Sequence, residues 1–217
     1  MHRTLALSIA LSLFAVGASH ARGIDVDKVN GSIHIDSSRH AGDLDTVNGG
    51  IHLDSGASAE KVSTVNGGID LGERTTVSSV ETVNGGIDIG AGARVTGTVE
   101  AVNGGIRVGR GAEIVGHASN VNGRFLLDGA HIGGGIETVS GDIDVGANSR
   151  VEGGILVDTQ HGWSLGKSRN PRVVIGPHAV VTGTLEFRRD VDLFVSESAT
   201  VGTISGATAK MFSGDHP

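Results

Sequence analysis

Apolar residues recur at a nearly constant spacing along most of the chain, and polar and apolar positions alternate between them. Aligning the recurring segment Val-Asn-Gly-Gly-Ile and its variants gives apolar columns two residues apart, the pattern of strands with one buried face. The apolar runs stop at Asn-Gly or Gly-Ala, which indicates short strands and tight corners rather than helices. The segment opens at Val29, Val47, Val65, Val83, Val102, Val121 and Val139.

Successive repeats start 18 or 19 residues apart. A unit this short buries its apolar face only by stacking on its neighbours, so the predicted fold is all-β. We expect a single-domain parallel β-solenoid (β-helix) of about nine coils of roughly 18–20 residues. Coils ~4.8 Å apart would give a rod of ~40 Å. Crossovers between parallel strands are mostly right-handed, which favours a right-handed solenoid.

An asparagine and a glycine follow the first valine of six repeats. When the coils stack, these asparagines are expected to form a structural ladder of side-chain amides along one corner. The glycine that follows is expected to supply the positive φ of that corner. The ladder residues are Asn30, Asn48, Asn66, Asn84, Asn103 and Asn122.

The repeat divides the chain into five segments. Residues 1–21 show a basic start, an apolar run and small residues before a cleavage point, the pattern of a secretory signal peptide. Regular coils are expected over residues 22–158, an inserted polar loop over 159–172, C-terminal coils over 173–204 and a polar tail over 205–217. The mature protein is therefore expected to be periplasmic, on the cell surface or secreted, with no membrane span after signal-peptide removal.

Composition narrows the functional classes. The chain has 36 glycines and no cysteine, so disulfides, thiolate nucleophiles and Cys-type zinc sites are excluded. Its net charge of −7 argues against a nucleic-acid partner, because phosphate binding needs clustered Lys and Arg. We expect no cofactor.

Two His-x-Asp units stand one coil apart. Alternation turns all four side chains outward, so stacking would bring two imidazoles and two carboxylates together, a candidate site for zinc, copper or nickel. A solvated polar face is the alternative. The same outward column continues with Asp70 and Asp88, which are expected to repel each other, and with Arg107, which would relieve Asp88. The candidate metal ligands are His34, Asp36, His52 and Asp54.

The inserted loop is the one local basic and aromatic patch of an acidic chain. Loops of repeat proteins often bind ligands. This loop is a candidate contact for an anionic glycan, a lipid headgroup or a protein, and the alternative is a loop whose tryptophan only covers the solenoid. The candidate ligand-binding residues are Trp163, Lys167, Arg169 and Arg172.

The repeats resemble two groups of bacterial solenoids. The pattern Ile/Val-Gly-x-x-Ala-x-Val-x-Gly-x-Ile/Leu, as from Ile89 to Val99 and from Ile175 to Leu185, is similar to that of the polymer-forming bactofilins. The Val-Asn-Gly-Gly-Ile runs are similar to adhesin-type β-solenoid repeats. The resemblance covers residues 24–204 and implies a scaffold or an adhesin, not an enzyme. Bactofilins are typically cytoplasmic, and this chain differs from them in carrying an export signal.

The expected function is therefore an exported, non-enzymatic structural or interaction protein, adhesin-like or scaffolding the envelope. Self-association through the solenoid ends is expected, because no helix precedes the first coil at Ile24 to cover its edge. Cell-envelope glycan or protein are further candidate partners. The alternatives are a metal- or anionic-glycan-binding surface protein, a polysaccharide lyase or hydrolase, and an acyltransferase of the hexapeptide-repeat type. The 19-residue coils break the sixfold phase that the last would need.

Overall fold

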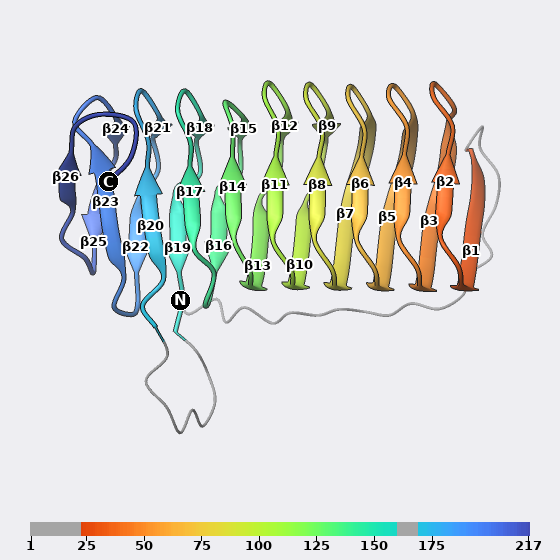
Figure 1. The fold of residues 1–217 in the computed structure, drawn as a ribbon, viewed down its shortest axis with the longest axis horizontal. Helices are drawn as coiled ribbons and strands as arrows, with labels where there is room; N and C mark the ends of the chain where they lie inside the picture. The colour runs from red at the N-terminus through yellow and green to blue at the C-terminus, as the bar shows by residue number, and fades with distance from the viewer. Residues whose placement is uncertain (1–22, 160–168) are drawn as a thin grey trace.

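The computed structural model describes residues 23–159 and 169–217, and over these ranges the chain winds into a parallel β-solenoid of about ten coils (Figure 1). The predicted all-β solenoid is confirmed. The predicted signal peptide lies outside the described residues. The part of the chain that is described holds no helix long and apolar enough to cross a membrane.

One face of the solenoid is a ten-stranded parallel sheet, here called sheet B, to which each coil contributes one strand. Most of its strands are three residues long, with the outer two side chains buried and the middle one turned outward. The strands are β2 (Ile33–Ile35), β4 (Ile51–Leu53), β6 (Ile69–Leu71), β8 (Ile87–Ile89), β11 (Ile106–Val108), β14 (Phe125–Leu127), β17 (Ile143–Val145), β20 (Arg172–Ile175), β23 (Asp192–Ser196) and β26 (Lys210–Phe212).

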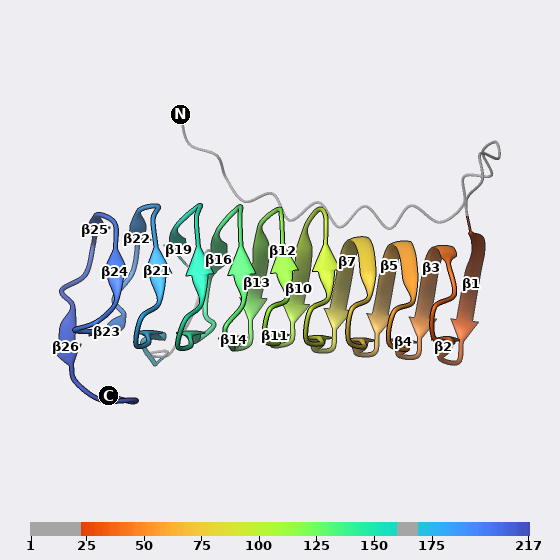
Figure 2. The same ribbon diagram turned by 90° about the horizontal axis from the view of Figure 1, so that it is seen from above.

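The remaining sixteen strands form sheet A, which changes character along the rod (Figure 2). Each of the first four coils contributes one strand of seven to nine residues. From the fifth coil on, two shorter strands take its place. The strands are β1 (Ile24–Asn30), β3 (Ala41–Asn48), β5 (Ser58–Asn66), β7 (Thr76–Asn84), β9 (Arg94–Val95), β10 (Val99–Asn103), β12 (Glu113–Ile114), β13 (Ala118–Asn122), β15 (His131–Ile132), β16 (Ile136–Thr138), β18 (Arg150–Val151), β19 (Ile155–Val157), β21 (Val180–Val181), β22 (Leu185–Phe187), β24 (Thr200–Val201) and β25 (Ile204–Ser205).

The split in sheet A follows from one extra residue. β7 pairs with both β9 and β10, so that Val77 faces Val95 while Val80 faces Val99. Two residues separate the inward valines of β7, but three separate those of the next coil, and Gly97 is the middle one. The chain therefore bends at Gly97, and the cross-section changes from two strands to three.

The core runs the length of the rod between the sheets. The inward columns that the alignment predicts are buried from the second coil onward, as Leu53, Val62 and Val95 show at 0% exposure. Phe125 replaces the usual isoleucine of its column and is equally buried. Inward threonines line one corner, where Thr64 Oγ1 donates a hydrogen bond to the carbonyl of Gly49 in the preceding coil, over 2.9 Å.

The six asparagines form a continuous amide ladder. Each Nδ2 donates to the Oδ1 of the asparagine one coil earlier, over 3.0–3.2 Å. The role expected for the following glycine is wrong at four of six positions, since only Gly31 and Gly123 have positive φ. The glycines between them are required because stacked backbones approach closely: a Cβ on Gly67 would collide with the carbonyl oxygen of Gly49.

Most of the left-handed residues lie instead in the turns after the first eight strands of sheet B. Gly56, Gly92, Gly111 and Gly129 have φ between 56° and 73° there. Other coils accept a side chain at the equivalent position. These residues are Ser38, Arg74, Asn148 and His178, with φ between 54° and 59°.

The solenoid continues into the segment predicted as a polar tail. β26 pairs with β23, and Ala207 and Ala209 pack against the core. Alanine is small and Met211 is 58% exposed, so this coil gives a weak hydrophobic pattern. The structure therefore has about ten coils where the sequence predicts about nine.

Candidate functional site

Two histidines stand side by side on the outer face of sheet B, at the end where the first coils lie. His34 is the middle residue of β2 and His52 of β4, and the two are directly paired in register. Their neighbours in the strands are inward isoleucines and a leucine, so alternation directs both imidazoles outward. The rings stack with centroids 5.2 Å apart and planes at 11°.

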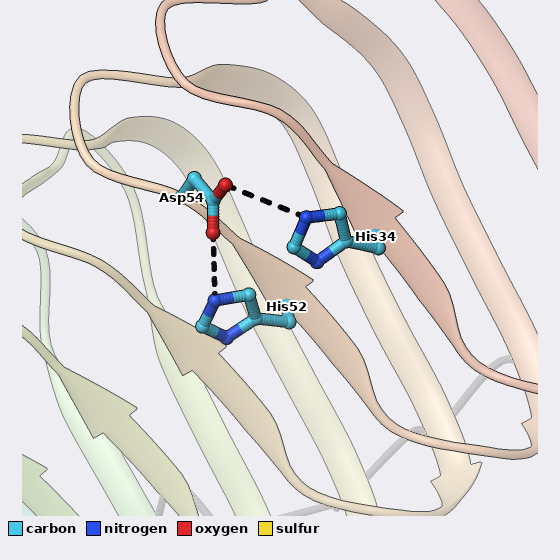
Figure 3. A group of neighbouring side chains, drawn as sticks. All are labelled: His34, His52 and Asp54. Atoms are coloured by element: carbon cyan, nitrogen blue, oxygen red, sulfur yellow. Dashed lines mark hydrogen bonds and ion pairs between the residues drawn. The ribbon is translucent and has the colours of Figure 1, made fainter.

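Aspartates directly after the same two strands contact these rings, and Figure 3 shows Asp54 between the two imidazoles. One Asp54 oxygen lies 2.9 Å from His52 Nε2, and the other lies 3.4 Å from His34 Nε2. Asp36 Oδ1 lies 3.7 Å from His34 Nε2. One ligand atom from each of His34, His52 and Asp54 lies within 4.8 Å of the others, so these three residues could hold a metal ion.

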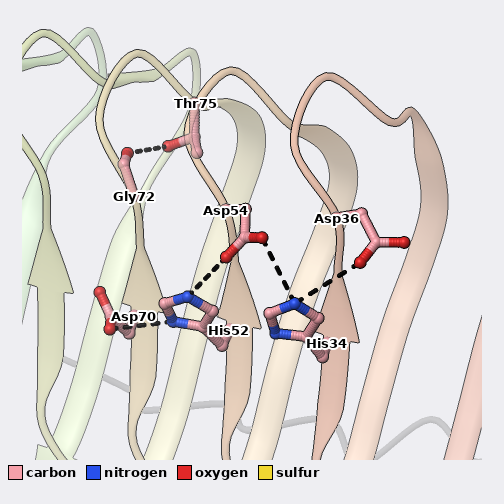
Figure 4. Close-up of polar contacts among 7 residues, drawn as sticks. All are labelled: His34, Asp36, His52, Asp54, Asp70, Gly72 and Thr75. Atoms are coloured by element: carbon pink, nitrogen blue, oxygen red, sulfur yellow. Dashed lines mark hydrogen bonds and ion pairs between the residues drawn. The ribbon is translucent and has the colours of Figure 1, made fainter.

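A further carboxylate approaches His52 from the other side. Asp70, the middle residue of β6, pairs in register with His52 and places Oδ2 2.9 Å from Nδ1 (Figure 4). Ionised carboxylates accept hydrogen bonds only, so His52 can bond to both Asp54 and Asp70 only when both ring nitrogens carry hydrogens.

The outward column from His52 to Asp88 lines a shallow groove of about 500 Å³. Asp70 and Asp88 are adjacent across β6 and β8, as the alignment predicts, and Arg107 follows Asp88. Asp70 also contacts His52, and the alignment does not predict this contact. The groove is lined by Ser32, Gly50, Ile51, His52, Gly68, Ile69, Asp70, Gly86 and Asp88.

Of the candidate loop residues, Trp163 and Lys167 lie outside the described residues, and the two arginines lie at the base of the segment. Arg169 Nη2 donates to Asp142 over 2.7 Å, and the backbone N–H of Arg172 donates to the other Asp142 oxygen over 2.8 Å. The Arg172 guanidinium lies 5.0 Å from the ring centre of Phe194 and contacts the carbonyl of Pro217. Both arginines thus have partners within the chain.

These contacts lower the pKa of Asp142. Burial alone would raise its pKa, but the hydrogen bonds from Arg169 and the Arg172 backbone and the charges of Arg169 and Arg124 outweigh it and lower the pKa below 3.8. On the other side of the segment, Asp158 is 7% exposed and lies 3.4 Å from Arg188. Charged pairs therefore fix described residues on both sides of the sequence gap, Asp158 before it and Arg169 after it.

Comparison with known proteins gives no family. No family model, no curated protein and no solved structure matches this chain.

Sequence reasoning missed two residues that shape these sites. Asp70 was aligned with the histidines, but its contact with His52 depends on ring orientation, which an alignment does not give. Asp142 lies in the corner of a repeat that reads Ser-Gly-Asp-Ile in place of Asn-Gly-Gly-Ile. This change from glycine to aspartate was the available signal. It occurs in the coil that directly precedes the inserted segment.

Proposed function

We propose that this chain is an exported structural protein without catalytic activity, a rigid β-solenoid that self-associates through the end formed by β1 and β2. The resemblance of its repeats to bactofilins and adhesin-type solenoids supports a scaffolding or surface role. The signal-peptide pattern of residues 1–21 supports export. Cell-envelope glycan or protein is the further partner class that this role suggests.

The observation that carries the proposal is the open core of the first coil. Ile24 is 81% exposed, whereas Ala41, with which it pairs in the next coil, is 4% exposed. Val26 is partly buried over a fully buried Leu44. Among the described strands, β1 and β2 each have a neighbour on one side only. Such an edge offers both apolar surface and free backbone groups to another strand.

The shape of the two ends favours contact between like ends. The first coil presents one continuous seven-residue strand, β1. At the other end the same face is split into β24 and β25, each two residues long. A head-to-tail stack would place a two-strand cross-section on a three-strand one. Two identical β1 ends match each other by construction, as in a dimer with twofold symmetry.

Lys28 disfavours the pairing of unrelated strands with the β1 edge. It occupies the inward column that Thr46 and Thr64 hold in the next coils, and its Nζ donates to the carbonyl of Ser32 over 2.7 Å. An inward charge on an edge strand opposes unselective strand addition. The expected product is therefore a defined head-to-head dimer.

Substitutions at the two ends test which end makes the contact. Ile24→Lys places a charge on the open core and is expected to weaken the dimer about 10- to 100-fold, because burial of an isoleucine is worth about 1.5–3 kcal/mol. Met211→Lys, at the other end, is the matched control and should leave the dissociation constant unchanged. Sedimentation equilibrium measures both. Equal affinities for wild type and Ile24→Lys would refute the β1 interface.

Single cysteines test the orientation without interference, because the chain has none of its own. Asp27→Cys, at the middle of β1 and so nearest a twofold axis, is expected to form disulfide-linked dimers under oxidation, and Met211→Cys is expected to stay monomeric on a reducing-agent-free gel. A head-to-tail arrangement would instead cross-link only a mixture of the two variants.

A further inference from the structure

The His–Asp cluster on sheet B has features that scaffolding does not require. Its rings and carboxylates come from three successive coils, β2, β4 and β6, and all face solvent. The side chains of His34 and His52 are 54% and 42% exposed. They are therefore accessible to a ligand from solution, and their substitution leaves the core untouched.

We propose that His34, His52 and Asp54 bind a divalent transition-metal ion, with zinc as the reference metal. Imidazole nitrogen and carboxylate oxygen are ligands that zinc, copper and nickel accept. His34 Nε2, His52 Nε2 and an Asp54 oxygen supply the three protein ligands. Asp36, 3.7 Å from His34 Nε2, stands ready as a fourth, and water completes the shell otherwise.

The main argument is that the ligand atoms of His34, His52 and Asp54 lie close together, and the hydrogen-bond partners of His52 support it. Asp54 faces Nε2 and Asp70 faces Nδ1, both at 2.9 Å. A neutral imidazole has one N–H and cannot bond to both carboxylates. A metal ion at Nε2 resolves this conflict, because it replaces one hydrogen with a cation that Asp54 also binds, while Nδ1–H still donates to Asp70.

Asp70 then acts as a positioning residue. Histidines that bind metals commonly donate the other ring N–H to a carboxylate, which fixes the tautomer and raises the basicity of the ligand. Asp70 occupies that place for His52. The three aspartates also offset the charge of a divalent ion, since Asp36, Asp54 and Asp70 together carry three negative charges when ionised.

Binding requires a small rearrangement. The lone pair of a ring nitrogen lies in the ring plane, so two rings stacked at 11° cannot both point at one ion. Tetrahedral zinc with bonds of about 2.0–2.2 Å brings its ligand atoms to about 3.3–3.5 Å from one another. Binding therefore requires the two exposed rings to rotate about Cβ–Cγ, starting from ligand atoms that lie within 4.8 Å of one another.

Isothermal titration of the purified exported protein with zinc chloride tests the site. The expected result is saturable binding of one zinc per chain, which weakens on acidification because protons compete for the imidazoles. His52→Ala and Asp54→Asn should abolish it. Asp70→Asn should weaken it 10- to 100-fold. His40→Ala, an exposed histidine in the turn before β3, is the matched control and should bind as wild type does.

Two results would overturn the proposal. No saturable binding by the wild type, or unchanged affinity in His52→Ala, removes the site altogether. Unchanged affinity in Asp70→Asn removes the role of that residue. Circular dichroism of each variant checks that the solenoid is intact, and light scattering with and without zinc keeps this result separate from that of dimerisation.

Discussion

The close approach of stacked backbones determines which residues fit in the corner that follows each asparagine. The backbone of one coil runs so close to the next that a methyl group at Gly67 would meet the carbonyl of Gly49, whereas a methyl group at Gly68 would lie at an ordinary 3.4 Å from the carbonyl oxygen of Gly86. Adjacent glycines with almost the same environment therefore have different tolerances.

Gly67→Ala is accordingly expected to destabilise the protein by about 3 kcal/mol or more, the cost of forcing apart a packed backbone. Gly68→Ala should change the free energy of unfolding by about 1 kcal/mol or less in either direction. Urea denaturation followed by circular dichroism gives both values. Equal losses would contradict the close-approach explanation.

The asparagine ladder predicts an effect that depends on position. Asn66 donates to Asn48 and accepts from Asn84, whereas Asn122, at the end of the ladder, donates to Asn103 only. With about 0.5–1.5 kcal/mol per hydrogen bond, Asn66→Ala should cost about 1–2 kcal/mol and Asn122→Ala about half as much. The same denaturation measurement applies, and a larger loss at Asn122 would show that the ladder is not the cause.

The lowered pKa of Asp142 makes the free energy of unfolding depend on pH. Its pKa is lowered in the folded chain, so its contribution is present at neutral pH and is lost as the pH falls below 3.8 through the folded value. Asp142→Asn should lower the melting temperature at neutral pH, and the gap from wild type should close in acid. A gap that stays constant over this range would contradict the assigned ion pair.

At the scale of the element, β1 is both an edge and the site of an unusual charge. Lys28→Thr restores the residue type that Thr46 and Thr64 have in the same column. The variant should dimerise more strongly than wild type, because the inward charge that opposes strand addition at β1 is gone. Size-exclusion chromatography measures the dimerisation. An unchanged elution profile would show that Lys28 does not oppose strand pairing at β1.

The elements also show how far a sequence can be interpreted. The inward columns around Ile51 and Val62 were predictable, because each coil repeats the same alternation. The split after β7 was not, since it depends on how one extra residue at Gly97 bends the chain. The last coil was missed because Ala207 and Ala209 carry little hydrophobic signal. At the site, residue spacing predicted that His34 and His52 would be neighbours, but not the orientation that joins His52 to Asp70.

At the scale of the whole molecule, the protein is a rod whose two ends differ. About ten coils at ~4.8 Å give a length near 48 Å, and one core runs through it. The net charge of −7 disfavours unselective lateral association between copies. The open β1 end is therefore the place where we expect the rod to join a second copy.

Light scattering on the wild-type protein from residue 22 onward, over a wide concentration series, tests this account most directly. The account predicts a mass that rises with concentration from that of one chain to that of two and then stays constant. A mass of one chain at every concentration would contradict it, and so would a mass that rises without limit.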